Sequence, residues 1–121
     1  MIKGLGTDIL KVSRFKRVLD KHPQRFLKRL FTQEEQDYAN RFKDSIIHLA
    51  GRFCAKEAVS KALGTGFGEK LSFADIRIEN DPQGKPVVFL SNRANKMFQD
   101  PQIEISISHC KDYATATAIW Y

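Results

Sequence analysis

The pattern of hydrophobic and polar positions changes character near Lys70. Before this point, and after a first predicted strand over residues 2–9, apolar residues recur at the three- and four-residue spacing of helices. Beyond it, apolar and polar residues alternate with the two-residue period of strands. The sequence therefore predicts an α+β fold, with helices in the first half and a mainly antiparallel sheet in the second.

Capping signals set the bounds of the predicted helices. Ser13 suits the N-cap of a first helix, and Pro23 suits the first turn of a second. Thr32, with Glu35 three residues later, has the pattern of a capping box. Gly64 is a natural C-terminal stop for a long helix, and a glycine-rich turn follows it. These signals predict helices over residues 14–21, 23–30, 33–42 and 45–63.

Alternation in the second half predicts strands separated by turns. Ile76 and Ile78 alternate with polar residues, and His109 continues the isoleucine face of the strand that it ends. A run of Asp, Pro and Gly residues from residue 81 is a turn by composition, and Ser91 suits the cap of a short helix through residue 99. The strands are predicted over residues 71–80, 87–90, 103–109 and 114–120.

Composition indicates an ordinary folded domain. The chain has 121 residues, of which 42% are hydrophobic and 28% charged, and residues 1–121 are expected to form a single domain. No stretch approaches the roughly 20 apolar residues of a membrane span. The N-terminus lacks a signal-peptide pattern, which favours a cytoplasmic protein. Cys54 and Cys110 lie in no CxxC pair, which argues against a zinc finger or a disulfide framework.

The net charge of +6 is concentrated at one end of the chain. Residues 1–32 hold nine basic and two acidic residues, whereas the remainder holds eleven basic and twelve acidic ones. Within the first predicted helix, Arg14, Arg17 and Lys21 recur at spacings of three and four, so they form one positive stripe. This asymmetry favours an acidic partner, either nucleic acid, an anionic membrane or an acidic protein, although a solvated helix face would look the same.

Charged residues interrupt the apolar stripe of the long helix. At about 100° per residue, Glu57 falls in the middle of the stripe and Lys61 falls beside it, whereas Arg52 and Lys56 lie on the far side. Inward-facing charges are costly unless they are paired or bind a ligand. One explanation is an i, i+4 salt bridge between Glu57 and Lys61. The other is a carboxylate and an ammonium group directed into a functional site.

Asp8 and His109 also break their local patterns. Gly4, Gly6 and Asp8 share one face of the first strand, and glycine in a strand often marks close approach by another backbone or a ligand. An Asp at the end of a strand more commonly caps the next turn. His109 ends the isoleucine face of its strand, where a structural histidine is the ordinary explanation.

Motif searches remove several classes of enzyme. The sequence has no P-loop, and its glycine-rich segment follows a helix instead of opening one, so the dinucleotide-binding fingerprint is absent. The three histidines lack the spacing of zinc ligands. Ser108 and His109 point to opposite faces of a strand, which excludes a serine-hydrolase pair.

The remaining residues favour phosphate chemistry. Two inward carboxylates, Asp8 and Glu57, suit Mg²⁺, which takes its other ligands from water and substrate phosphates. Lys61, His109 and free N–H groups near Gly66 are suited to hold further phosphate charge. A Mg²⁺-dependent phosphatase and a small nucleic-acid-binding module stay open as alternatives. The second is disfavoured because the sequence has no basic–aromatic platform and its inward carboxylates would repel phosphate without a metal.

Three segments of the chain resemble holo-acyl-carrier-protein synthases. Residues 4–9 (GLGTDI) resemble the N-terminal G-x-D-I/L element of that family, and residues 105–114 contain its S-I-S/T-H element. Residues 51–66 (GRFCAKEAVSKALGTG) resemble its long and specific GRFAAKEAxxKAxGTG signature. Cys54, where the family often has Ala, and Thr7 are small departures that touch none of the charged positions.

The resemblance implies a 4′-phosphopantetheinyl transferase. Such an enzyme moves the phosphopantetheine arm of coenzyme A onto a serine of apo acyl carrier protein, releases adenosine 3′,5′-bisphosphate and supports fatty acid biosynthesis. The resemblance implies that Asp8 and Glu57 bind Mg²⁺ and that Glu57 and Lys61 are catalytic, with Glu57 or a metal-bound water as the general base. The residues expected to bind coenzyme A are Arg52, Lys61, Gly66 and His109.

The resemblance also implies partners and assembly. Carrier proteins are acidic, and Arg14, Arg17 and Lys21 are expected to dock them; no nucleic-acid or membrane partner is expected. The short members of the family are homotrimers with active sites between subunits. The bare glycines of residues 4–6 and the small residues of 114–118 are expected to provide flat surfaces for packing between subunits.

Overall fold

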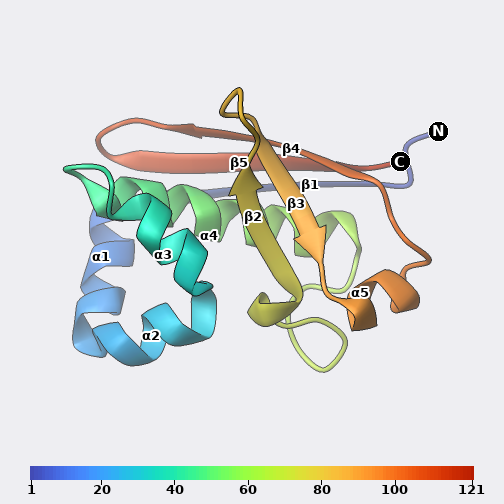
Figure 1. The fold of residues 1–121 in the computed structure, drawn as a ribbon, viewed down its shortest axis with the longest axis horizontal. Coiled ribbons are helices and arrows are strands. Elements are labelled where there is room, and N and C mark those ends of the chain that lie inside the picture. Colours follow the sequence, from blue (N-terminus) through green and yellow to red (C-terminus); the bar gives the residue numbers. More distant parts are fainter.

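The computed structural model of the protein describes residues 1–121 and has the expected α+β architecture (Figure 1). Helices α1, α2 and α3 gather at one end of the long helix α4, and α5 lies at the other end. None of the helices is both long and apolar enough to cross a membrane. In chain order the elements are β1 (Gly4–Lys11), α1 (Val12–Lys21), α2 (Pro23–Leu30), α3 (Gln33–Ala39), α4 (Ser45–Ala62), the 3-10 turn η1 (Phe73–Asp75), β2 (Ile76–Asn80), β3 (Pro86–Leu90), α5 (Asn92–Met97), β4 (Ile103–His109) and β5 (Tyr113–Trp120).

Two antiparallel sheets surround α4. The first has the strand order β1-β5-β4, so β1 and β4 form its two edges, and the second consists of β2 and β3. In the first sheet Asp8 pairs with Ala116, which in turn pairs with Ile107 of β4. Because side chains alternate between the faces of a strand, Asp8 and His109 both lie on the face that packs against α4, at opposite edges of the sheet.

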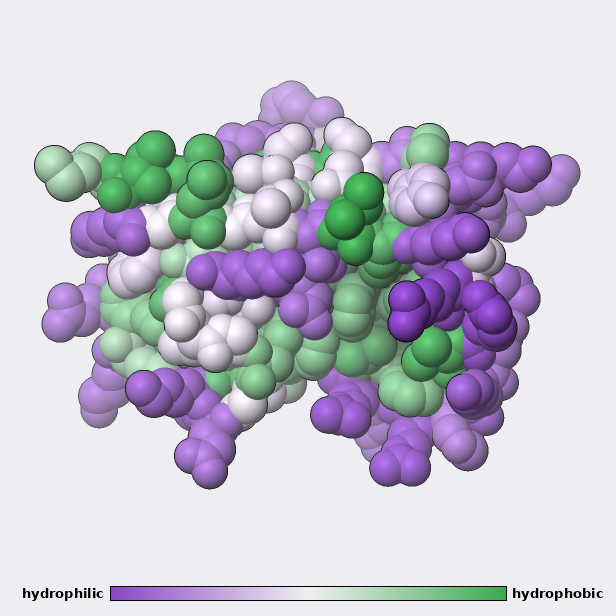
Figure 2. Space-filling view, turned by 180° about the vertical axis from the view of Figure 1, so that it is seen from behind, coloured by the Kyte–Doolittle hydropathy of each residue, from purple (hydrophilic) through white to green (hydrophobic).

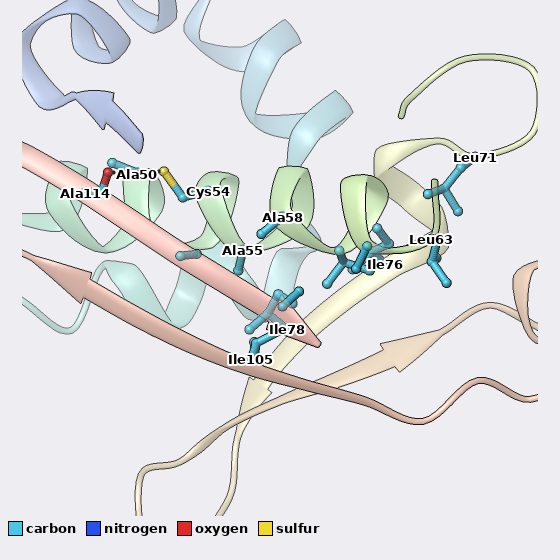
Figure 3. Close-up of a cluster of buried hydrophobic side chains, with 14 of the residues drawn as sticks. Ala50, Cys54, Ala55, Ala58, Leu63, Leu71, Ile76, Ile78, Ile105 and Ala114 are labelled. Atoms are coloured by element: carbon cyan, nitrogen blue, oxygen red, sulfur yellow. Dashed lines mark hydrogen bonds between the residues drawn. The ribbon is translucent and has the colours of Figure 1, made fainter. Parts of the chain in front are cut away.

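The core forms where α4 packs against both sheets. Figure 3 shows Ala55 and Ala58 of α4 close to Ile78 of β2 and Ile105 of β4. Small side chains on α4 allow the strands to approach its backbone closely, and the buried alanines of β5 (Ala114, Ala116 and Ala118) pack on the same face. The resulting core holds α4 rigidly between the two sheets.

The glycines of β1 serve contacts within the chain. A Cβ atom on Gly4 would lie 1.9 Å from the carbonyl oxygen of Ala62, and one on Gly6 would lie 1.9 Å from that of Ala58. The bare glycine face and the small residues of β5 are therefore covered by α4. The expectation that they form flat surfaces between subunits is wrong, because their lack of side chains is what lets β1 and β5 pack on this helix.

Several predicted boundaries differ from the structure, most by only one or two residues. Strand β1 continues to Lys11 through pairing with Tyr113, so α1 begins at Val12 and Ser13 does not cap it. Residues 73–75 of the predicted strand 71–80 form η1 instead, because Asp75 turns inward to accept hydrogen bonds from Ser72 and Ser91. The third helix ends at Ala39 and not at residue 42. The capping box of Thr32 and Glu35 is confirmed.

Candidate active site

Asp8, Glu57 and Lys61 form a charged cluster where β1 crosses α4. Lys61 Nζ donates a hydrogen bond to Asp8 Oδ1 at 3.2 Å and another to the Thr7 carbonyl oxygen at 2.9 Å. The side chains of Lys61 and Asp8 are 49% and 18% exposed, so the cluster opens to solvent. The close contact of Gly6 with α4 sets this position, since it brings the next inward side chain of β1 beside the helix.

Glu57 is half-buried beside Asp8. Burial raises the pKa of Glu57, the negative charge of Asp8 raises it further, and Lys61 opposes both effects. The alternative of an i, i+4 salt bridge is wrong, because Lys61 pairs with Asp8 and not with Glu57. Two carboxylates that repel each other are suited to share a cation. Their oxygen atoms form a donor set that fits a hard cation such as Mg²⁺.

Cys54 lies next to this cluster. Burial, followed by the negative charges of Asp8 and Glu57, raises the pKa of its thiol to about 12. The thiol therefore stays protonated at neutral pH, and it donates a hydrogen bond to the Ala114 carbonyl oxygen at 3.5 Å. As a departure from the family signature Cys54 replaces none of the charged residues, but in the structure it lies beside them, because β1 carries Asp8 over this part of α4.

An apolar cavity of about 570 Å³ opens beside Glu57. Phe15 and Phe53 contact each other in its wall with ring centroids 5.4 Å apart, and Phe53 stacks on Phe73 at 5.5 Å. Arg14 and Arg29 also line the cavity. The sequence did not identify this cavity, because its walls come from β1, α1, α2, α4 and η1, and only the tertiary fold brings these phenylalanines together.

The predicted basic stripe of α1 lies at the surface. Arg14, Arg17 and Lys21 are all exposed, and together with Val18 they line a shallow hollow. Arg14 belongs to both the hollow and the apolar cavity, so the basic surface is continuous with the cavity mouth.

Arg52 and His109 meet on the other side of α4. Both line a smaller cavity of about 190 Å³ together with His48. The Arg52 guanidinium lies 4.3 Å from the ring centroid of Tyr38 and donates to Asn80 Oδ1, while its Nε is buried without a partner. Burial lowers the pKa of Arg52. Only 4% of this residue is exposed, so it is a buried cation and not part of a solvated helix face.

His48 is a site residue that the sequence did not single out. Its ring stacks on Phe42 with centroids 3.7 Å apart and lies edge-on to His109 at 5.1 Å. Burial lowers the pKa of His48, and the neighbouring His109 lowers it further. A lone histidine near the start of a helix carried no signal, because its partner comes from β4.

The glycine-rich turn after α4 uses its amides internally. Thr65 and Gly66 both donate their backbone N–H groups to the Ser60 carbonyl oxygen, at 3.3 and 3.2 Å, and Gly64 donates to Lys61 at 3.0 Å. The expectation of free N–H groups is therefore wrong for Gly64, Thr65 and Gly66 itself, because their N–H groups satisfy the last carbonyl groups of the helix. Gly66 has a φ of 61°, and a Cβ there would meet open space.

A fully buried ion pair lies next to Glu57 in the sequence. Lys56 and Glu35 have side chains with no exposed surface, and Lys56 Nζ donates to Glu35 Oε1 at 2.8 Å and to the Leu30 carbonyl oxygen at 2.8 Å. Glu35 also accepts from the backbone N–H groups of Thr32 and Ile78. The expected position of Lys56 on the far side of the helix is correct, but α3 and β2 cover that side. The capping box was the only sequence signal at Glu35.

The expected site residues thus form two groups within one chain. Asp8, Glu57 and Lys61 lie on the β1 side of α4, and Arg52 and His109 lie on the opposite side of the helix. The cavity beside Glu57 and the cavity beside His109 share no lining residue. The helix α4 therefore separates a carboxylate–ammonium cluster from an arginine–histidine cluster.

Comparisons with known proteins identify the family of the chain. Residues 4–118 match the model of the 4′-phosphopantetheinyl transferase superfamily. A holo-[acyl-carrier-protein] synthase of Protochlamydia amoebophila is 50% identical over 120 residues, which cover 99% of this chain and 98% of that protein. The crystal structure of the holo-[acyl-carrier-protein] synthase from Neisseria meningitidis has a TM-score of 0.91 and 35% identity, covering 100% of this chain and 99% of that one.

A further solved relative contains a ligand. The holo-[acyl-carrier-protein] synthase of Helicobacter pylori, in complex with coenzyme A, has a TM-score of 0.89 and 34% identity, covering 97% of this chain and 99% of that one. The chain therefore belongs to the holo-[acyl-carrier-protein] synthases, which are enzymes of the phosphopantetheinyl transferase class. The family resemblance and the fold class expected from the sequence are both confirmed.

Proposed function

We propose that this enzyme transfers the 4′-phosphopantetheine group of coenzyme A to a serine of an apo acyl carrier protein, depends on Mg²⁺ and releases adenosine 3′,5′-bisphosphate. The observation that carries the proposal is the cluster of Asp8, Glu57 and Lys61 in a chain of this family. We further propose that residues 1–121 act as one phosphopantetheinyl transferase domain, in the cytoplasm, in support of fatty acid biosynthesis.

Asp8 and Glu57 would hold the Mg²⁺ ion. Bound there, Mg²⁺ supplies positive charge that neutralises the pyrophosphate oxygens of coenzyme A. The carrier serine attacks the β-phosphorus, and the P–O bond to the departing adenosine 3′,5′-bisphosphate breaks. Lys61 stabilises the negative charge that develops on the phosphates. Glu57, whose pKa is raised by burial, or a water held at the site accepts the serine proton.

Arg52, Lys61, Gly66 and His109 would bind coenzyme A. Arg52 and His109 line one cavity and offer nitrogen donors to a phosphate, and the Nε of Arg52 has no partner within the chain. Lys61 is half-exposed, so a phosphate oxygen can approach its ammonium group. Open space around the Gly66 backbone lets a ligand approach closely.

The basic surface of α1 would dock the carrier protein. Arg14, Arg17 and Lys21 complement an acidic carrier, and the adjoining apolar cavity lies beside Glu57. Rim charges mainly speed association, so Arg14→Glu is expected to raise KM for the carrier several-fold and leave KM for coenzyme A nearly unchanged. Lys96→Glu, on α5 at the other end of the molecule, is the matched control. Equal effects of Arg14→Glu on both substrates would contradict the docking role.

The enzyme would act as a homotrimer with active sites between subunits. One chain carries its two groups of site residues on opposite sides of α4, so a second copy is needed to bring them together. The sheet face turned away from α4 is suited to this contact, because Leu5 and Ile9 are 65% and 67% exposed there. Figure 2 shows hydrophobic side chains at the upper left of this face and a second group to the right of its centre.

Complementation between two inactive variants tests this shared site. Asp8→Ala and His109→Ala, each inactive when refolded alone, are expected to regain activity when they are unfolded and refolded together. Some interfaces will then combine an intact carboxylate pair with an intact histidine. If His109→Ala is inactive, trimers form and no activity returns, the two groups act within one chain.

One assay tests the function itself. The protein is incubated with coenzyme A, Mg²⁺ and apo acyl carrier protein, and the carrier is weighed by mass spectrometry. We expect the mass of the carrier to increase by one phosphopantetheine group. We expect no increase when EDTA removes the metal. An unchanged carrier with phosphate released from coenzyme A would indicate a phosphatase instead. An unchanged carrier together with intact coenzyme A would exclude both the transferase and the phosphatase activity.

A further inference from the structure

The ammonium group of Lys61 interacts with one of the two carboxylates that would hold a metal ion. Its Nζ donates to Asp8 Oδ1 at 3.2 Å, and the Thr7 carbonyl oxygen at 2.9 Å is its second partner. Glu57 faces the same cluster without an ion-pair partner of its own. Lys61 thus supplies the positive charge that balances Asp8 within the chain.

We propose that Lys61 competes with the divalent cation for Asp8, and that it leaves this carboxylate for a phosphate oxygen when metal and coenzyme A bind together. The inference rests on the proposed function, because it concerns the same metal and the same substrate. The new element is that binding of the metal ion and binding of coenzyme A depend on each other through the Lys61 side chain.

The Lys61–Asp8 pair is suited to exchange partners. Nearly half of the Lys61 side chain is exposed, and an ion pair in contact with solvent is weak. The chain offers the Lys61 ammonium group two hydrogen bonds, to Asp8 and to the Thr7 carbonyl oxygen, and both lie at exposed positions. Lys56 differs, because its ammonium group is enclosed with no exposed surface and cannot exchange.

Charge makes the two binding events cooperative. A divalent cation on Asp8 and Glu57 repels an ammonium group held a few ångströms away, so Lys61 weakens metal binding to the substrate-free enzyme. The phosphates of coenzyme A give Lys61 a new partner and remove this repulsion. Because coupling between two ligands is reciprocal, metal must strengthen coenzyme A binding by the same factor as coenzyme A strengthens metal binding.

Calorimetric titration with Mg²⁺ in the absence of coenzyme A tests the competition. We expect Lys61→Met to bind Mg²⁺ about tenfold more tightly than the wild type, because a unit positive charge is removed beside the ligand oxygens. Lys61→Arg keeps the charge and should bind as weakly as the wild type. Lys85→Met is the matched control, since Lys85 is also half-exposed in an ion pair, with Glu104.

The same titrations with coenzyme A present, and no carrier, test the coupling. Coenzyme A should tighten Mg²⁺ binding in the wild type, and Lys61→Met should lose most of this enhancement. Unchanged or weaker Mg²⁺ binding by Lys61→Met in the substrate-free enzyme would overturn the proposal. If Glu57→Gln nevertheless abolishes Mg²⁺ binding, the proposed function survives that result. If Asp8→Asn and Glu57→Gln both leave Mg²⁺ binding intact, the metal site and the competition both fail.

Discussion

Two lysines of α4 pair with carboxylates in opposite environments. Lys56 and Glu35 have no exposed side-chain surface, whereas Lys61 and Asp8 are 49% and 18% exposed. The buried pair joins α4 to the ends of α2 and α3 and, through Glu35, to β2. The open pair lies beside Glu57 and a cavity mouth. A charge that its own chain encloses therefore fixes structure, whereas a charge open to solvent remains available for ligands.

The energetics of the two pairs should differ accordingly. Burial lowers the pKa of Lys56, and Glu35 opposes this effect by stabilising the ammonium form. Removing one partner from a buried ion pair costs about 3–5 kcal/mol, because the other charge stays buried without compensation. A solvent-exposed pair contributes about 0–1 kcal/mol. Stability measurements therefore separate the structural pair from the functional one.

The largest effect is expected from Glu35→Gln. This change keeps the shape of the side chain but leaves the Lys56 ammonium buried without a counter-charge. The free energy of unfolding in urea should fall by about 3–5 kcal/mol. Glu34→Gln, on the exposed face of the same helix, is the control and should change stability by less than about 0.5 kcal/mol. A loss below about 1 kcal/mol in Glu35→Gln would remove the distinction between the two pairs.

Gly6→Ala should disturb the open pair through the backbone. The added Cβ would lie 1.9 Å from the Ala58 carbonyl oxygen, so β1 must move away from α4 and carry Asp8 away from Lys61. We expect a loss of about 1–3 kcal/mol in urea unfolding, typical of overpacking, together with a fall in transfer activity. Gly68→Ala is the control, because its Cβ would meet nothing within 4 Å. Wild-type stability and activity in Gly6→Ala would show that this close contact does not position Asp8.

A smaller effect, of opposite sign, is expected at Glu57. Its pKa is raised above the ordinary value of 4.5 by burial and by Asp8, so the folded chain binds this proton more tightly than the unfolded chain. The associated stability is complete below pH 4.5 and is lost as pH rises through the raised pKa. Glu57→Gln should therefore stabilise the metal-free protein at pH 7, by less than about 1 kcal/mol.

Thermal unfolding at several pH values checks this prediction. The gain in stability from Glu57→Gln should vanish near pH 4, where the glutamate of the wild type is protonated and therefore as neutral as the glutamine of the variant. A gain that stays constant from pH 4 to pH 7 would mean that ionisation of Glu57 is not its cause.

The smallest effect is expected from a double-mutant cycle on the open pair. Asp8→Asn and Lys61→Met should show a coupling energy below about 1 kcal/mol in urea unfolding, decreasing with added salt. The same cycle on Glu35→Gln and Lys56→Met should give a larger coupling that responds weakly to salt. Equal couplings would mean that exposure does not distinguish the pairs.

The sequence predicted features that depend on local chemistry. The capping box at Thr32, the strand over residues 103–109 and the positive stripe of α1 follow from patterns that neighbouring residues create by themselves. The sequence placed Glu57 in the middle of the apolar stripe of α4, whereas the structure leaves this residue half-buried at the edge of a cavity. Short-range patterns therefore gave a correct fold class and most element types.

Features that depend on distant contacts were not predictable in this way. Lys56 and Glu35 are 21 residues apart and meet only because α3 folds over α4. The sequence marked Gly6 as a point of close approach, but only the structure identifies what approaches it, which is the carbonyl group of Ala58. His48 acquired its neighbour from β4. In each case the partner comes from another element, and the sequence around either residue does not identify that partner.

We infer that the open cluster of Asp8, Glu57 and Lys61, and not the buried pair, performs the chemistry. Mass spectrometry of apo acyl carrier protein after incubation with Glu57→Gln, coenzyme A and Mg²⁺ tests it most directly. The account predicts a folded variant with at least wild-type stability at pH 7 and with transfer reduced by about 100-fold or more, as expected when a group that acts on the transition state is lost. Full transfer by folded Glu57→Gln at ordinary Mg²⁺ concentration would contradict the account.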